Sequence, residues 1–207
     1  MEVRIINGIE VKLQKKDCVN VVPYGFVNTI DYKKQIKGSA KDLVELGKFS
    51  KSLGGITFIG AESDNCGSLR KSVFVFESGK LISICDMNFA EEKHSPSFGY
   101  KIVNFFGKKI GVLVDRDLFN PDAVKSLINC GVNAIIDLYE GLLLKKVEVA
   151  TEFYAYVYGV DFITASKNKT VAFNAFGEVV DFNSECEGCF DFCGVYREIK
   201  CKKRGSI

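Results

Sequence analysis

GKKIGVLVDRDLFNPDAVKSLINCGVNAIIDL, residues Gly107–Leu138, is the stretch of the sequence that decides the fold. Lys109–Val114 is a short apolar run rich in β-branched residues, and this pattern predicts a buried strand. A polar elbow, Asp115–Asp117, follows directly. Asn120 then stands where a helix cap is preferred, and Pro121 suits the first turn of the helix that begins there.

The predicted helix is amphipathic and is followed by a second strand. Its apolar residues recur at helical spacing: Phe119, Ala123, Val124, Leu127 and Ile128. Gly131 ends the helix, and Ala134–Leu138 is again apolar and short. The stretch therefore predicts a βαβ unit. Ligands and catalytic groups in such units lie where strands end, so the polar elbow is the first candidate site.

The rest of the chain is predicted to alternate between strands, helices and loops. The same criteria predict strands at Glu2–Ile6, Cys18–Val22, Ile56–Gly60, Lys71–Phe76, Leu81–Cys85, Phe162–Ala165, Val171–Ala175 and Val179–Phe182. Amphipathic helices are predicted at Ser39–Leu53 and Leu142–Val157. Ala61–Leu69 and Glu91–Tyr100 are polar and are expected to be loops.

Length and composition favour a single α/β domain over residues 1–207, with residues 183–207 as a Cys-rich C-terminal tail. The 28 basic and 26 acidic side chains nearly balance, so the sequence gives no basic footprint for nucleic acid. No apolar run approaches the roughly 20 residues that span a bilayer. We therefore expect a cytoplasmic protein without membrane or nucleic-acid partners, whose eight cysteines are reduced thiols.

Strand, elbow, Asp-Leu-Phe-x-Pro, amphipathic helix, glycine and apolar strand together resemble the nucleophile elbow of the carbon-nitrogen hydrolase (nitrilase) family. The resemblance implies a four-layer α-β-β-α sandwich. Only about twenty residues precede Pro23-Tyr24 at the end of the second strand, so the sandwich is expected to be somewhat shortened at its first crossover. The resemblance also implies a homodimer formed through Phe119–Ile128 and Leu142–Tyr158, which are rich in apolar residues.

The family's catalytic triad consists of a glutamate base, a lysine and a cysteine nucleophile. The resemblance places Tyr24 at the position of the glutamate, Met87 at that of the lysine and Asp115 at that of the cysteine. Removing one such group typically lowers the rate about 10²- to 10⁴-fold, so a chain lacking all three should have no activity by this mechanism. We expect Tyr24 to donate a hydrogen bond to Asp115 in place of the catalytic pair.

The leading hypothesis is therefore a catalytically inactive relative of these hydrolases that binds a small molecule or a protein partner and needs no cofactor. One alternative is a divergent amide hydrolase in which Asp115 or Asp117 assists water. A cysteine from elsewhere is another possible nucleophile for such an enzyme, and the candidates by residue type are Cys18, Cys85 and Cys130.

Two further features bear on function. Cys186, Cys189, Cys193 and Cys201 include one Cys-x-x-Cys pair, a spacing suited to zinc, an iron-sulfur cluster or redox chemistry. The second pair is too widely spaced for a zinc ribbon, so ordinary thiols without a bound metal are the preferred interpretation. His94 is the only histidine, and its polar loop predicts a solvated side chain.

Overall fold

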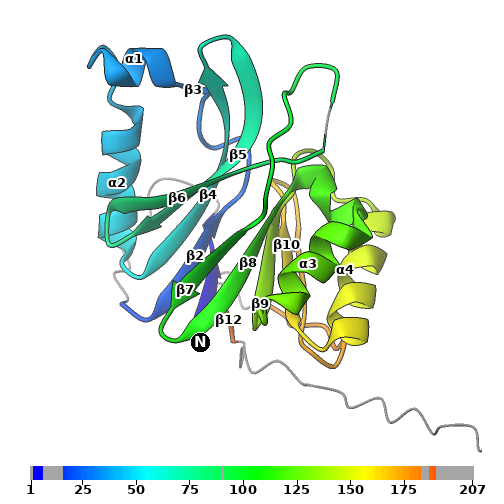
Figure 1. The fold of residues 1–207 in the computed structure, drawn as a ribbon. Helices are drawn as coiled ribbons and strands as arrows, with labels where there is room; N and C mark the ends of the chain where they lie inside the picture. Colours follow the sequence, from blue (N-terminus) through cyan, green and yellow to red (C-terminus); the bar gives the residue numbers. More distant parts are fainter. Residues whose placement is uncertain (1, 7–15, 90, 183–186, 190–207) are drawn as a thin grey trace, which may run out of the picture.

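The computed structural model describes residues 2–6, 16–89, 91–182 and, for the backbone only, 187–189. Two β-sheets lie face to face in the middle of the molecule, with helices on both outer sides (Figure 1). The expected α-β-β-α architecture is therefore confirmed. Cys186, Cys193 and Cys201 lie outside the described residues, so the candidate metal set in the tail is not described.

The first sheet has seven strands in the order β12-β1-β2-β4-β5-β6, with β3 paired to β4. Their bounds are β1 (Glu2–Ile5), β2 (Cys18–Val22), β3 (Ile30–Asp31), β4 (Ile56–Asn65), β5 (Ser68–Glu77), β6 (Lys80–Asp86) and β12 (Glu187–Cys189). Strands β1, β2 and β4 run parallel, whereas β4, β5 and β6 form an antiparallel meander.

The second sheet has five strands in the order β11-β10-β9-β8-β7. Their bounds are β7 (Lys101–Phe105), β8 (Lys108–Val114), β9 (Ala134–Leu138), β10 (Asp161–Ala165) and β11 (Thr170–Phe173). The three central strands are parallel, so the elbow after β8 and the loop after β9 emerge at the same edge of the sheet.

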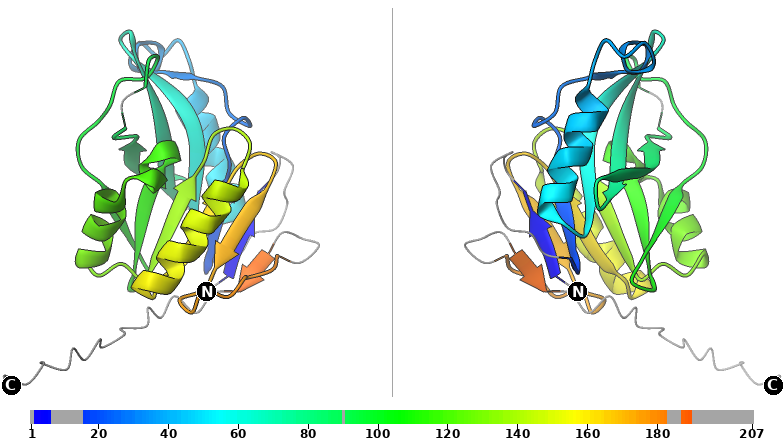
Figure 2. Two further views of the ribbon diagram at one scale, coloured as in Figure 1. Left: turned by 90° about the vertical axis from the view of Figure 1, so that its right-hand side faces the viewer. Right: turned by 90° about the vertical axis from the view of Figure 1, so that its left-hand side faces the viewer.

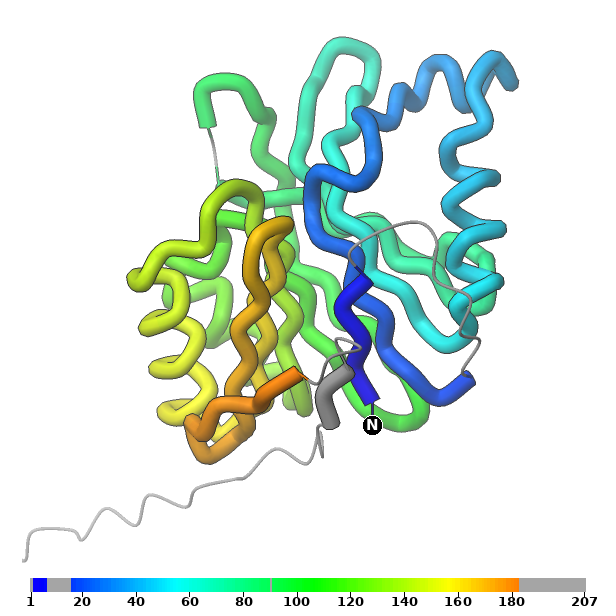
Figure 3. The backbone as a smooth tube through the Cα atoms, turned by 180° about the vertical axis from the view of Figure 1, so that it is seen from behind, coloured from blue at the N-terminus to red at the C-terminus, as the bar shows by residue number. Residues whose placement is uncertain are grey.

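Each sheet is covered on its outer face by helices, as the two side views in Figure 2 show. The helices are α1 (Tyr32–Ile36), α2 (Asp42–Leu53), the 3₁₀ helix η1 (Asp115–Phe119), α3 (Pro121–Asn129) and α4 (Lys145–Tyr158). Helix α2 packs on the first sheet, whereas α3 and α4 pack on the second. The view from behind also places α2 and α4 on opposite outer sides (Figure 3).

The predicted βαβ unit is confirmed, and its local chemistry explains its shape. Asn120 caps α3, because its side-chain oxygen accepts a hydrogen bond from the Asp122 amide, and Pro121 occupies the first turn. Strands β8 and β9 pair in parallel with Val114 opposite Leu138.

Three apolar layers hold the four layers of the sandwich together. The largest lies between the sheets and includes Val73, Val112 and Ile136. A second layer, with Leu127 and Phe162, lies between the second sheet and helices α3 and α4. The third lies between the first sheet and α2, around Phe74. The alternation of side chains along each strand sends successive residues to different layers.

Several sequence predictions are wrong in detail. Ala61–Leu69 is not a polar loop, because β4 continues to Asn65 and β5 begins at Ser68, with only a tight turn between them. Polar residues there are compatible with strands because the hairpin satisfies their backbone groups. Val179–Phe182 forms only an isolated bridge, between Val179 and Phe173. The short elements β3, α1 and β7 were not predicted.

No helix in the described part of the chain is long and apolar enough to cross a membrane.

Candidate functional site

The elbow after β8 carries Asp115, a buried carboxylate held in an unusual backbone conformation. Its φ is 53°, in the left-handed region that residues other than glycine rarely adopt, and its side chain is about 3% exposed. Aspartate tolerates this region better than most residues. Burial raises the pKa of Asp115, and the hydrogen bond from Lys71 acts in the opposite direction.

Lys71 is the partner of Asp115, and it comes from the other sheet. It lies on β5, and its Nζ is 2.5 Å from Asp115 Oδ2. Burial alone would lower the pKa of Lys71, but hydrogen bonds to Asp115 and Glu91 outweigh burial and raise it above its ordinary value. Lys71 is therefore a buried ammonium group at the elbow.

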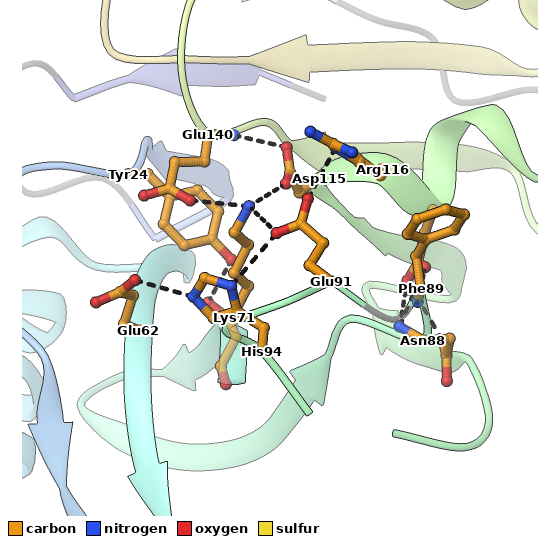
Figure 4. A network of polar contacts seen from close by, with 12 residues as sticks. Tyr24, Glu62, Lys71, Asn88, Phe89, Glu91, His94, Asp115, Arg116 and Glu140 are labelled. Carbon is orange, nitrogen blue, oxygen red and sulfur yellow. Dashed lines mark hydrogen bonds and ion pairs between the residues drawn. The ribbon is translucent and has the colours of Figure 1, made fainter. Parts of the chain in front are cut away.

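Two more carboxylates complete what we call the Lys71 cluster, which consists of Lys71, Glu91, Asp115 and Glu140. Lys71 Nζ lies 2.9 Å from Glu91 Oε2 and 3.0 Å from Glu140 Oε2. Figure 4 shows the ammonium group between the three acids. The Glu140 amide also donates to Asp115 Oδ1, at 3.2 Å. The single ammonium group thus has three carboxylate partners within 3.0 Å.

His94 extends this cluster toward Glu62, contrary to the prediction of a solvated loop side chain. The residue is only 9% exposed. Its Nε2 lies 3.0 Å from Glu62 Oε1, and its Nδ1 lies 3.3 Å from Glu91 Oε2. Arg116 Nε contacts the other oxygen of Glu91 at 2.8 Å. His94 and Glu91 of this loop thus pair with each other, with Glu62 on β4 and with Lys71 on β5.

Tyr24 and Met87 lie beside the cluster without joining it. The expected hydrogen bond from Tyr24 to Asp115 is not formed, because the Tyr24 hydroxyl donates to the Ser72 carbonyl at 3.0 Å. Asp115 takes its hydrogen bonds from Lys71 and Glu140 instead. Met87 is buried, and its amide donates to the Lys71 carbonyl at 2.9 Å. Tyr24, Met87 and Asp115 therefore all contact the same part of β5. Asp115 pairs with the Lys71 side chain, Met87 bonds to the Lys71 carbonyl, and Tyr24 bonds to the Ser72 carbonyl.

Asp117 holds the loop that follows β6 against the elbow. Its carboxylate accepts the backbone N–H groups of Asn88 and Phe89 at 3.0 to 3.1 Å. Burial raises the pKa of Asp117 to about 6 despite these hydrogen bonds. The loop that carries Glu91 and His94 is therefore positioned by a group that titrates in the mildly acidic range.

Asp137 on β9 is fully buried, and neither of its carboxylate oxygens has a hydrogen-bond partner among the described residues. Its register neighbours across the sheet are Leu113 and Thr164. Burial raises the pKa of Asp137 well above its ordinary value, and the negative charges of Asp115 and Asp117 raise it further. Its buried position behind the elbow therefore favours the neutral, protonated form of the carboxyl group.

Two cavities border the Lys71 cluster, one at Glu91 and the other at Glu140. The first has a volume of about 460 Å³ and is lined by Glu91, His94 and Arg116 among others. The second, which we call the Tyr24 cavity, has a volume of about 370 Å³ and is lined by Tyr24, Glu140, Leu142 and Lys167 among others. Both volumes lie at the lower end of the range for small-molecule sites.

Sequence reasoning missed Lys71, Glu62, Glu91 and Glu140. The sequence pattern contains a signal for Lys71 and another for Glu140. Lys71, Val73 and Val75 alternate along β5, and both valines face the space between the sheets, so Lys71 faces the same way. Glu140 follows β9, which is parallel to β8 and ends beside the elbow.

Among the residues the structure describes, no group of three or more His, Cys, Asp or Glu side chains is arranged to hold a metal ion.

The fold is similar to solved structures of the nitrilase superfamily at low sequence identity. Saccharomyces cerevisiae Nit3, a member of that superfamily, superposes with a TM-score of 0.68 at 15% identity, over 90% of this chain and 87% of Nit3. A carbon-nitrogen hydrolase from Helicobacter pylori G27 gives 0.68 at 14% identity, over 84% of this chain and 77% of that one.

A cysteine-to-alanine mutant of a Nesterenkonia AN1 amidase from the same superfamily gives a TM-score of 0.69 at 11% identity, over 87% of this chain and 85% of that one. No protein-family model matches the chain, and no curated protein matches it in sequence. The chain therefore has the nitrilase-type fold, and likeness at this level of identity speaks for the fold alone.

Proposed function

We propose that this protein is a nitrilase-fold protein that binds a small molecule beside the elbow without hydrolysing carbon-nitrogen bonds. The observation that carries the proposal is the saturation of Lys71. Its ammonium group lies within 3.0 Å of carboxylate oxygens of Asp115, Glu91 and Glu140, so its charge is already compensated by the chain's own acids rather than left for the oxyanion of a substrate. A hydrolase needs a donor for that oxyanion at the moment of reaction.

The residue at the elbow supports the same conclusion. A carboxylate that attacked an amide would form an anhydride that reverts easily, and Asp115 is in addition ion-paired to Lys71. Tyr24 uses its hydroxyl proton on the Ser72 carbonyl, and burial raises its pKa well above the ordinary value. Tyr24 is therefore a poor general base near neutral pH.

The cysteines offer little support for the alternative of a divergent hydrolase. Burial raises the pKa of Cys85 to about 12, so its reactive thiolate form is scarce at neutral pH. Cys18 is fully buried, and its Sγ contacts Asn20 at 3.5 Å. Cys130 is exposed at the carboxyl end of α3, whereas the elbow precedes the amino end of that helix. Asp117 is already engaged by the loop after β6.

The test is a hydrolysis assay on simple amides and nitriles with the wild type, Asp115→Ala and Asp115→Cys. We expect no turnover by the wild type above the no-protein blank. Asp115→Cys should produce a thiol of depressed pKa beside Lys71, which alkylates with iodoacetamide at a lower pH than a free cysteine. Wild-type amidase activity that Asp115→Ala abolishes would refute the proposal.

A homodimer is the second part of the proposal. Four large side chains on α4 are between 46% and 56% exposed, namely Val149, Phe153, Tyr156 and Val157. Their spacing of four, three and one residues places them on one face of the helix. An apolar stripe of this kind favours a self-complementary contact between two copies of the chain.

A further inference from the structure

The Tyr24 cavity brings together the ends of strands from both sheets. Tyr24 follows β2, Glu140 follows β9, and Lys167 follows β10. The cavity lies beside the Lys71 cluster, because Glu140 belongs to both. Of the two cavities near the elbow, this one has the more apolar wall, formed in part by Tyr24 and Leu142.

Glu140 gives the cavity a fixed negative charge. Its Oε2 is held 3.0 Å from Lys71 Nζ, and its amide donates to Asp115. Its Oε1 has no hydrogen-bond partner among the described residues, and the side chain is 39% exposed. One carboxylate oxygen is therefore positioned by the cluster and remains available to a ligand.

Lys167 gives the cavity a positive charge on another wall. Its stem lies against Gly25, where an added Cβ would come within 2.9 Å of Lys167 Cδ. Its Nζ lies 5.8 Å from the centre of the Phe26 ring, within cation–π range. In the described part of the chain Lys167 has no carboxylate partner. The ammonium group is thus located by packing, and its hydrogen-bond donors remain free.

We infer that the Tyr24 cavity takes a small zwitterion such as an amino acid, an inference that rests on the proposed non-hydrolytic binding function. The ligand's ammonium group binds Glu140 Oε1, and its carboxylate binds Lys167 Nζ. Its short carbon chain lies along Tyr24 and Leu142. A zwitterion satisfies both charges at once, whereas a singly charged ligand leaves one of them without a partner in the cavity.

The test is calorimetric titration of the full-length protein with three probes of equal chain length: 4-aminobutanoate, butylamine and butanoate. We expect 4-aminobutanoate to bind roughly tenfold or more tightly than either singly charged probe, since a hydrogen bond to a charged group contributes at least this much. Lys167→Met should reduce its affinity to that of butylamine. Glu140→Gln should reduce it to that of butanoate.

Lys93→Met is the matched control, because Lys93 lines the other cavity and should not affect the titration. The inference is overturned if butylamine or butanoate binds as tightly as 4-aminobutanoate, if none of the three binds, or if Lys167→Met has no effect in a folded protein. Tight binding of one singly charged probe would refute the zwitterion site but would still agree with the proposed binding function. Wild-type hydrolysis of amides would refute the proposed function, and the titration would then decide separately whether the cavity binds a zwitterion.

Discussion

Lys71 decides what the elbow can do. A buried ammonium group requires a compensating negative charge. Three carboxylates lie around Lys71, so the cluster contains more acidic groups than its single positive charge requires. The position that the family resemblance assigns to a lysine is held by Met87, yet a lysine enters the same region from the neighbouring strand, one hydrogen bond away. The ammonium group is therefore present, but it is engaged with the chain's own acids.

Replacing Lys71 by methionine should destabilise the fold strongly. The substitution keeps the length of the side chain but leaves Asp115 without its cation, whereas Glu91 keeps Arg116. Breaking a buried ion pair from one side costs about 3–5 kcal/mol. Urea unfolding at neutral pH measures the loss. Lys93→Met is the control and should change the free energy of unfolding by less than about 0.5 kcal/mol. A Lys71→Met protein as stable as the wild type would show that the cluster contributes nothing to stability.

At the scale of elements, the loop after β6 depends on Asp117. The folded-state pKa of about 6 lies above the ordinary value of 3.8, so the protonated form is favoured in the folded protein. The resulting contribution to stability is fully present below about pH 4 and is lost as the pH rises through about 6.

Unfolding measured between pH 4 and pH 7 should therefore show a decline in stability assignable to Asp117, at most about 3 kcal/mol for a shift of this size. Asp117→Asn removes the titration and should flatten that part of the profile, although it also weakens the hold on Asn88 and Phe89. An unchanged pH profile in Asp117→Asn would contradict the assignment. Asp122→Asn, at an exposed position on α3, is the control.

The elements that the sequence predicted well are those whose apolar pattern is long or whose caps are distinctive. The unit β8-α3-β9 combines two apolar strands with an Asn-Pro helix start, and the structure confirms it. The pattern fails where polar residues lie in strands, as at Ala61–Leu69, because backbone pairing across a hairpin is not visible in hydrophobicity. The sequence pointed to Asp115 as a candidate, but not to Lys71, Glu91 or Glu140, which surround it in the structure. These side chains come together only because the two sheets pack face to face, and the local sequence pattern does not reveal that packing.

At the scale of the whole molecule, assembly through α4 gives a direct prediction. Light scattering should yield twice the 23.0 kDa chain mass at micromolar concentration. Phe153→Glu places a charge in the middle of the exposed apolar stripe and should give a monomer, since a buried unpaired charge is costly. Lys48→Glu, a change of charge at an exposed position on α2, on the opposite outer side of the molecule, is the control. A monomeric wild type would contradict the proposed dimer.

The Lys71 cluster also joins the two sheets, because Lys71 belongs to β5 of the first sheet whereas Asp115 and Glu140 follow strands of the second. Sliding one sheet over the other would separate buried opposite charges as well as apolar side chains. The two halves of the sandwich should therefore lose their protection against amide hydrogen exchange together, as one cooperative unit. Because the cluster is largely buried, added salt should screen it only weakly, so this cooperativity should persist at high ionic strength.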